Sequence, residues 1–216
     1  RGSCYSNTEE RRVMKKAIAI LVVLSIVAFA SQVAIDPVQV ERDYDWLRYD
    51  DGTYNWLTWG GTYRGVWFNA QDFVPGATDG MVQQAELWFY HHSSYPWDTS
   101  DVYIEIWNGD AMGPTAQLDQ TMLTAVHVSP IYTTYSPELE VEQNFWCLAN
   151  TEMSAGGWPA ILGDNMNTTI SHSFYSDDFI VWEPWTIDSA CNYFVAVYWE
   201  PSAFENTSWG ALKATF

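Results

Sequence analysis

Hydrophobic and polar positions along the chain alternate in short runs, which is the pattern of β-strands that bury one face. The runs that alternate, or are continuously apolar, lie at residues 64–68, 85–90, 102–107, 138–142, 145–149 and 193–199. In the second and third of these, the apolar face is expected to carry Ala85, Leu87, Phe89, Val102, Ile104 and Ile106. Long helix-forming stretches are nearly absent, so we expect strands to dominate the fold.

Residues that favour turns separate these runs. Gly accepts a positive φ, Pro fixes φ, and Asn or Asp tolerates the left-handed conformation. The turn-forming groups are Asp51-Gly52, Gly60-Gly61, Pro75-Gly76, Asn108-Gly109-Asp110, Gly113-Pro114 and Gly156-Gly157. Strands joined by turns rather than by crossover helices predict an all-β, antiparallel β-sandwich over residues 49–200. Residues 31–48, which contain Pro37, are expected to be a poorly ordered lead-in, and residues 201–216 a C-terminal tail.

Residues 14–30 have the layout of a secretory signal peptide with a signal helix. Lys15 and Lys16 form a basic start, an apolar run follows, and Ala28-Phe29-Ala30 supplies the small residues that precede a cleavage site. Cleavage there predicts a secreted or cell-surface protein that has no membrane contact afterwards. The alternative is an uncleaved anchor, because extension of the run to Ile35 gives about the 20 residues that a spanning helix needs.

Residues 1–13 stand before the basic start of the signal peptide, where no such extension is expected. We interpret them as an untranslated leader, with translation beginning at Met14, or as a disordered extension. If they are an untranslated leader, Cys4 is not part of the protein. This arrangement favours a bacterial export route.

The chain is strongly acidic, with 9 Lys and Arg against 27 Asp and Glu and a formal net charge of −18. Removal of residues 1–30 takes away five basic and two acidic residues, so the remainder is more acidic still. Such a surface repels phosphate backbones and anionic lipids, which excludes nucleic acid as a partner. The 13 Trp, 13 Tyr and 10 Phe exclude a disordered chain and favour strands.

Two cysteines, Cys147 and Cys191, remain in the expected mature chain. In an exported protein an even pair favours a disulfide. Two buried thiols that pack as small apolar groups are equally compatible with their positions in predicted strands. Neither cysteine has the spacing of a zinc ligand set.

The polar faces of residues 85–90 and 102–107 carry the same mixture of aromatic and acidic side chains, in opposite order. These candidate ligand-binding residues are Glu86, Trp88, Tyr90, Tyr103, Glu105 and Trp107. If the two strands are antiparallel neighbours, the six side chains form one patch. Aromatic rings stack on the C–H face of sugars and carboxylates accept hydroxyl hydrogen bonds, so the patch suits carbohydrate. The alternative is that loops or a partner domain cover both faces and the aromatic side chains simply pack.

Catalytic residues are not expected, because the chain has no GxSxG, HExxH or Cys/His signature. Glu86 and Glu105 are the one carboxylate pair that we would test for glycoside hydrolysis, but no deep cleft that raises one pKa is indicated. No cofactor is expected apart from calcium, for which Asp50, Asp51 and Asp164 are the candidate ligands. Turn capping is the commoner role of such residues. The four histidines are interpreted as structural or surface residues.

The order of several motifs along the chain is similar to that of a known family. They are Tyr49-Asp50-Asp51-Gly52-Thr53, Val66-Trp67-Phe68, Ile161-Leu162-Gly163-Asp164 and Ser173-Phe174-Tyr175-Ser176-Asp177-Asp178. With these motifs, residues 49–216 resemble the jelly-roll-like β-sandwich modules of large secreted bacterial proteins, which are often found ahead of C-terminal sorting or Ig-like domains. The resemblance implies a jelly-roll-like fold without a catalytic constellation. Cys147 and Cys191 depart from the family pattern.

These features predict a secreted or cell-surface, non-catalytic module for binding or adhesion. Glycans or other extracellular surface components are the expected partners, and carbohydrate is the first ligand to test. The alternatives are a structural spacer without a small-molecule ligand and an enzyme that resembles a glycoside hydrolase.

Overall fold

The structure is a computed structural model, and it describes residues 32–39, 46–58, 60–90, 97–154, 158–164, 170–187 and 189–202. These residues belong to one compact unit, Gln32–Phe216. The predicted leader and signal peptide, the Gly156-Gly157 turn and most of the predicted C-terminal tail lie outside the described residues. In the described part of the chain, no helix has the length and apolar character needed to cross a membrane.

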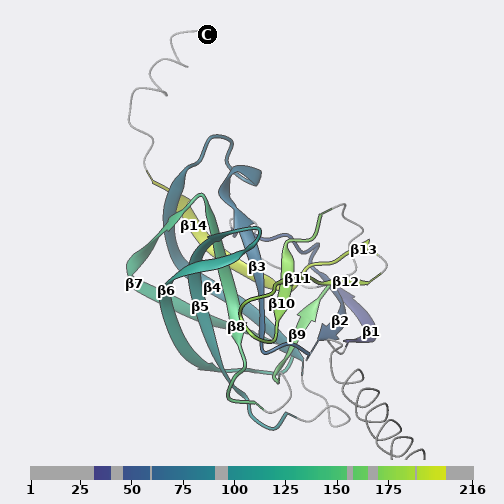
Figure 1. The fold of residues 1–216 in the computed structure, drawn as a ribbon. Helices are drawn as coiled ribbons and strands as arrows, with labels where there is room; N and C mark the ends of the chain where they lie inside the picture. Colours follow the sequence, from purple (N-terminus) through teal and green to yellow (C-terminus); the bar gives the residue numbers. More distant parts are fainter. Residues whose placement is uncertain are drawn as a thin grey trace, which may run out of the picture. The chain divides into compact units, whose positions relative to one another are not determined.

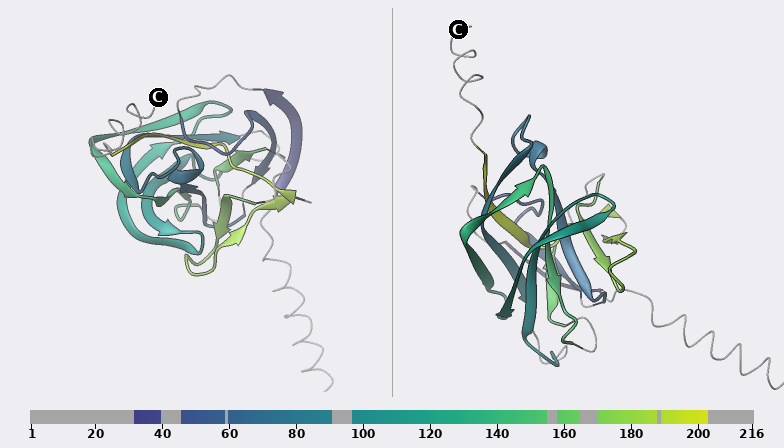
Figure 2. Two further views of the ribbon diagram at one scale, coloured as in Figure 1. Left: turned by 90° about the horizontal axis from the view of Figure 1, so that it is seen from above. Right: turned by 60° about the vertical axis from the view of Figure 1, so that its left-hand side comes forward.

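The described residues form an antiparallel β-sandwich, as predicted (Figures 1 and 2). The first sheet contains, in order, β1 (Gln32–Gln39), β2 (Thr53–Thr58), β9 (Ala160–Gly163), β4 (Asp79–Tyr90) and β14 (Val195–Pro201), and β7 (Pro130–Glu142) also pairs with β4. The second sheet contains, in order, β11 (Glu183–Pro184), β10 (Ser173–Ser176), β3 (Tyr63–Asn69), β8 (Asn144–Asn150), β5 (Asp101–Asp110) and β6 (Gly113–Thr124).

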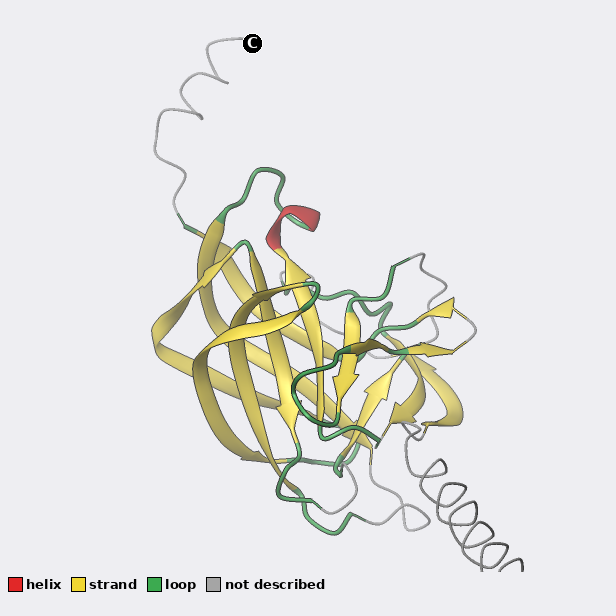
Figure 3. Cartoon of the chain, in the orientation of Figure 1, coloured by secondary structure: helices red, strands yellow, loops and turns green. Residues whose placement is uncertain are grey.

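Two small elements complete the described fold. A two-stranded ribbon is formed by β12 (Thr186–Ile187) and β13 (Ser189–Ala190). A single 3-10 turn, η1 (Ala70–Asp72), follows β3 and is the helical element that Figure 3 shows among the strands.

The core lies between the two sheets and is built from alternate side chains of their strands. Those that were expected to face it in β4 and β5 are all 0% exposed: Ala85, Leu87, Phe89, Val102, Ile104 and Ile106. Burial of one large aliphatic or aromatic side chain stabilises the fold by about 1.5–3 kcal/mol. Because the strands are pleated, the intervening side chains point to the outer face of each sheet. The period-two pattern is confirmed in these strands.

Part of the predicted lead-in is a strand rather than an irregular segment. β1 is an edge strand that pairs with β2, and its register shifts between Ala34 and Val38. Pro37 falls within this shift. Proline lacks the N–H that a sheet ladder requires, and it is tolerated at an edge or a bulge. The expectation of a poorly ordered lead-in was therefore wrong for Gln32–Gln39.

The hairpin between β5 and β6 turns later than predicted. Asn108-Gly109-Asp110 belongs to β5 and Gly113-Pro114 to β6, so Ala111 and Met112 form the turn. The register shifts between Asn108 and Gly109. A Cβ on Gly109 would lie 2.4 Å from the backbone oxygen of Gly113. The glycine therefore marks a bulge where the two strands approach closely.

Cys147, in β8, and Cys191, directly after β13, are buried in the core as thiols. Of the two alternatives for this pair, the structure has the two buried thiols and not the disulfide. Burial raises the pKa of the Cys147 thiol, which keeps this cysteine in its unreactive neutral form.

Arg64 is fully buried and connects the two sheets across the core. From β3 its guanidinium donates to the backbone carbonyl of Thr58 in β2 and, at 2.9 Å, to that of Pro159 just before β9. Desolvation lowers the pKa of Arg64 to about 10, so the side chain remains charged at neutral pH. Arg64 lies on the same face of β3 as Val66 and Phe68, which is the face that the alternation of residues 64–68 assigns to the core. The buried charge is tolerated there because it binds backbone carbonyl groups.

Candidate functional site

The structure does not bring the six predicted ligand-binding residues together. β4 belongs to the first sheet and β5 to the second, so their outward faces lie on opposite sides of the sandwich. One outer face carries Glu86, Trp88 and Tyr90, and the other carries Tyr103, Glu105 and Trp107. The prediction of a single patch was wrong, because it assumed that the two strands are neighbours. The same separation means that Glu86 and Glu105 share no cleft in which they act as a hydrolytic pair.

On both strands, the acid and the indole two residues later form a hydrogen-bonded pair. Trp88 Nε1 donates to Glu86 Oε1 at 2.7 Å. Trp107 Nε1 donates to Glu105 Oε2, also at 2.7 Å. Residues i and i+2 share one face of a strand, so the Glu-x-Trp spacing places the indole N–H beside the carboxylate. The acidic and aromatic side chains that indicated a sugar site therefore bind each other, through a charge-assisted hydrogen bond from the indole to the carboxylate.

Glu105 is a structural carboxylate rather than a ligand-binding one. Besides Trp107, it accepts hydrogen bonds from Gln120 Nε2 at 2.8 Å and from Asn150 Nδ2 at 2.7 Å. It is 2% exposed, and its three N–H donors come from three neighbouring strands. Trp88 is also buried, at 8% exposed, and packs in a small cluster on the outside of the first sheet. Glu105 and Trp88 therefore serve packing and hydrogen bonding within the protein, which was the alternative to a ligand-binding role.

An exposed aromatic cluster lies elsewhere on the first outer face, which is the outward side of β7, β4 and β14. Trp46 lies between Tyr132 of β7 and Tyr198 of β14, with ring centroids 6.0 Å and 5.9 Å away. We call these three residues the aromatic platform. Tyr132 is 49% exposed, and the other two are half-buried.

Backbone pairing places the aromatic platform. Leu47 and Val197 exchange two backbone hydrogen bonds, of 2.9 and 3.1 Å, which hold Trp46 beside β14. In the sheet register, Tyr132 is opposite Glu86 of β4, and Tyr198 is opposite Gln84 two residues before it on the same face of β4. The two tyrosines therefore lie on either side of β4, and the platform spans three adjacent strands.

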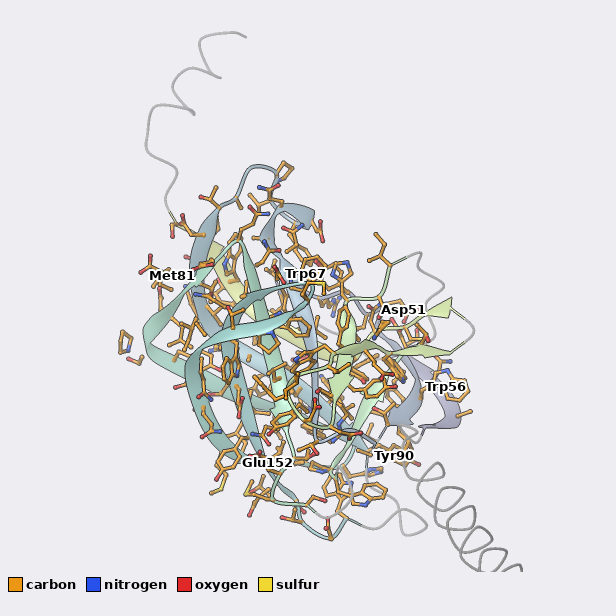
Figure 4. The ribbon with its side chains drawn as sticks, viewed as in Figure 1. Asp51, Trp56, Trp67, Met81, Tyr90 and Glu152 are labelled. Atoms are coloured by element: carbon orange, nitrogen blue, oxygen red, sulfur yellow. The ribbon has the colours of Figure 1, made fainter. Side chains whose placement is uncertain are left out.

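The second outer face, formed by β3, β8, β5 and β6, carries a row of indoles. Trp67, Trp146 and Trp107 are opposite one another on three neighbouring strands. Trp146 is completely buried, whereas the other two are half-buried. Figure 4 shows Trp67 toward one end of the domain and Glu152, which follows β8, toward the other.

The two remaining tyrosines of the prediction belong to different sheets. Tyr90 ends β4, and its ring centroid is 5.0 Å from that of His127. Tyr103 is in β5, where it is opposite Asn150 of β8. Both side chains are half-buried. Neither contributes to the aromatic platform.

The three candidate calcium ligands do approach one another, but their carboxylates bind backbone N–H groups. Asp50 Oδ1 accepts from Gly52 at 3.1 Å, Asp164 Oδ2 from Asp51 at 3.1 Å, and Asp164 Oδ1 from Asn192 at 2.7 Å. Asp164 is 0% exposed. Within the described ranges, no group of three or more His, Cys, Asp or Glu residues is placed to hold a metal ion. These hydrogen bonds have the turn-capping role that was considered for them.

His172 is held between two aromatic rings. Its ring centroid is 3.6 Å from that of Tyr49 and 5.0 Å from that of Trp67, and both pairs are nearly parallel. Its Nε2 lies 3.9 Å from Asp72 Oδ2. Burial lowers the pKa of His172, although the carbonyl of Trp67 and the charge of Asp72 act in the opposite direction. His172 is thus a neutral, structural side chain at pH 7.

The aromatic platform is not predicted by the sequence pattern, for two reasons. Trp46 lies in the segment that was expected to be an irregular lead-in. Tyr132 lies in a part of β7 for which no strand was predicted, although the alternation of buried Ile131 and Thr133 with exposed Tyr132 and Thr134 is a usable strand signal. Only Tyr198 lies in a predicted strand.

No protein-family model, curated protein or solved structure matches the chain. The resemblance to jelly-roll-like modules of secreted bacterial proteins therefore stays a prediction.

Proposed function

We propose that this domain is a non-catalytic binding module and that its aromatic platform takes the flat face of sugar rings. The observation that carries the proposal is the surface cluster of exposed Tyr132 with half-buried Trp46 and Tyr198, which crosses three adjacent strands. Tyr and Trp offer large, rigid apolar surfaces with a polar tip, which suits the alternating C–H and hydroxyl surface of a sugar. Tyr132 and Tyr198 lie on the two strands that flank β4, so about two strand spacings of roughly 4.8 Å separate them, and this span favours a glycan of several units over a monosaccharide.

Polar side chains beside the platform support a carbohydrate ligand. Gln84 is half-buried on the same face of β4, and Thr134 is exposed on β7. Tyr198 Oη donates to Glu200 Oε1 at 3.3 Å, so an exposed carboxylate lies next to one of the rings. These groups are suited to accept or donate hydrogen bonds to sugar hydroxyls.

The charge of the protein narrows the ligand class. A chain with a formal net charge of −18 repels anionic polymers. Neutral polysaccharides are therefore the favoured ligands, and sulfated or uronic-acid-rich glycans are disfavoured. We propose that the module meets them outside the cell, which rests on the signal-peptide pattern of residues 14–30.

A glycan array tests the proposal. The unsubstituted domain, Tyr132→Ala and Tyr198→Ala are compared on neutral and anionic glycans. We expect binding to at least one neutral glycan, and we expect each substitution to weaken it about 10-fold or more. A 10-fold change corresponds to about 1.4 kcal/mol, which is what the stacking contact and the buried area of one ring supply together. Tyr132 is 49% exposed and Tyr198 is half-buried, so the fold should tolerate both changes.

The matched control is Tyr103→Ala, which removes a half-buried tyrosine from the opposite outer face. This variant should bind glycans as well as the unsubstituted domain does. Equal loss of binding in Tyr103→Ala and Tyr132→Ala would show that the platform is not the binding surface.

A structural spacer is the second candidate function. It is favoured by the two Glu-x-Trp pairs, in which the aromatic and acidic groups satisfy each other within the protein. A spacer predicts no binding on any array and no change on substitution of Tyr132, apart from a small effect on stability.

A further inference from the structure

A segment of irregular backbone, residues 177–182, connects β10 to β11 beside the second outer face. We call this segment the strap. Phe179, in its middle, has a φ of +64°. A bulky residue with a positive φ is a true outlier and costs on the order of 1–3 kcal/mol, so the surrounding structure must hold it in place. Such strain is concentrated at ligand clamps and switch regions.

The strap is held by a small set of local hydrogen bonds. Asp178 Oδ1 accepts from the backbone N–H groups of Ile180 and Val181, at 2.8 and 3.0 Å. The N–H of Phe179 donates to Ser176 Oγ at 3.0 Å. Ile180 is 79% and Val181 58% exposed. Because these two side chains already face solvent, displacement of the strap would expose little more of their apolar surface. The hydrogen bonds of Ile180 and Val181 are exposed to solvent, and exposed backbone hydrogen bonds open more easily than buried ones.

The ring of Phe179 lies among the aromatic side chains of the second outer face. Its centroid is 4.8 Å from that of Tyr63, edge to face, and 4.8 Å from that of Trp107, tilted by 47°. Trp182 is 5.4 Å away and itself packs on the buried Trp146 at 5.1 Å. A six-membered ring is therefore already held between a tyrosine from β3 and an indole from β5.

Polar groups lie beside these two aromatic walls. Tyr63 Oη donates to the carboxylate of Glu152, which is exposed. Asn150 Nδ2 donates to Glu105 at 2.7 Å and contacts Glu152 Oε2 at 3.4 Å. Apolar walls with a few carboxylate and amide groups beside them are the usual composition of a small-ligand site.

We propose that the strap is a displaceable plug and that Phe179 occupies a subsite which takes a pyranose ring of a neutral glycan when the strap moves away. The C–H faces of the sugar replace the phenyl ring between Tyr63 and Trp107, and its hydroxyl groups bind the exposed carboxylate of Glu152. This subsite lies on the second sheet, whereas the aromatic platform lies on the first. An experiment can therefore contradict the subsite without contradicting binding at the platform, and the reverse.

The direct test is Phe179→Gly, which removes the plugging ring and places glycine at a positive φ that it adopts without strain. The probes are cellohexaose, chitohexaose and mannohexaose, titrated by calorimetry in the Tyr132→Ala background so that the platform does not contribute. We expect at least one probe to bind 10-fold or more tightly to the Phe179→Gly variant. Trp107→Ala, added to that variant, should abolish the gain.

The matched control is Ile180→Gly, which alters an exposed residue of the same strap and leaves the phenyl ring in place. It should give no gain. The proposal is overturned if no probe gains affinity, or if the gain survives Trp107→Ala. It is equally overturned if N-acetyl-phenylalanine amide gains affinity and the sugars do not, because the subsite then takes an aromatic side chain.

A measurement on the unsubstituted protein covers the case in which Phe179→Gly fails to fold. Amide hydrogen exchange compares Ile180 and Val181 of the strap with Cys147 and Leu148 of β8. We expect the two strap amides to exchange by local opening, at least 100-fold faster than those of β8. Exchange of both pairs at the rate of global unfolding would contradict a displaceable plug.

Discussion

At the scale of single residues, the spacing Glu-x-Trp has two physical uses that a sequence does not separate. An exposed Glu-x-Trp face offers a carboxylate and a ring to a sugar, whereas a buried one offers the carboxylate to its own indole. Burial decides between them, and Glu86 and Glu105 are 7% and 2% exposed. The alternation of the strands predicted which face these side chains occupy, but it carries no information on what covers that face.

The role of Glu105 is tested by comparing Glu105→Leu with Glu105→Gln. Leucine leaves the N–H groups of Trp107, Gln120 and Asn150 without their acceptor. Asn150 is buried and Trp107 half-buried, whereas the exposed Gln120 can bind water instead. Each buried donor that loses its partner costs about 1–3 kcal/mol, so we expect a loss of about 2 kcal/mol or more in the free energy of unfolding. Glutamine retains one acceptor oxygen and should cost less. Urea unfolding measures both, and equal stability of the two variants would refute a structural carboxylate.

The stack around His172 predicts a pH dependence of stability. Because its folded-state pKa is lowered, the unfolded chain binds the proton more tightly than the folded chain. The free energy of unfolding should therefore fall as pH drops through about 6.5, the ordinary pKa of histidine, and this contribution is fully lost below the folded-state pKa. Urea unfolding between pH 8 and pH 5 measures it.

Histidine variants identify the group responsible for that slope. His172→Gln should remove the part of the pH dependence that lies between about 6.5 and the folded-state pKa. His127→Gln, at an exposed position, should leave it unchanged. An unchanged slope in His172→Gln, or a slope that disappears in His127→Gln, would assign the titration to another site.

At the scale of elements, alternation predicted strands well and their partners poorly. β3, β4, β5, β8 and β14 all contain a run that the apolar pattern identifies. The pattern says which residues share a face of one strand, but the neighbour of that strand depends on long-range pairing. β4 pairs with β7, β9 and β14, and β5 pairs with β6 and β8, so the two strands that the candidate site required as neighbours never meet.

The bulge in the β5–β6 hairpin gives a prediction at this scale. Gly109→Ala places a Cβ 2.4 Å from Gly113 O and 2.7 Å from Pro114 Cα, both of which are backbone atoms that cannot move independently. We expect a loss of about 2 kcal/mol or more in the free energy of unfolding. Gly76→Ala is the control, because it has a positive φ but no atom within 4 Å, and it should cost about 1 kcal/mol. A larger effect at Gly76 would contradict the close approach.

At the scale of the whole molecule, the two outer faces of the sandwich are different surfaces. The first carries the exposed aromatic platform, and the second has its aromatic side chains partly covered by the strap. The alternating runs and the turns between them predicted that this acidic, aromatic-rich chain folds as a β-sandwich. It did not predict that Trp46, from the supposed lead-in, joins Tyr132 and Tyr198, because that contact links segments far apart in the sequence.

The most direct test of a binding function on the first outer face is calorimetric titration with a neutral glycan retained on the array. The unsubstituted domain, Tyr132→Ala and Tyr103→Ala are titrated side by side. We predict a dissociation constant raised 10-fold or more by Tyr132→Ala, equivalent to about 1.4 kcal/mol, and unchanged by Tyr103→Ala. The same dissociation constant for the unsubstituted domain and Tyr132→Ala would contradict the account.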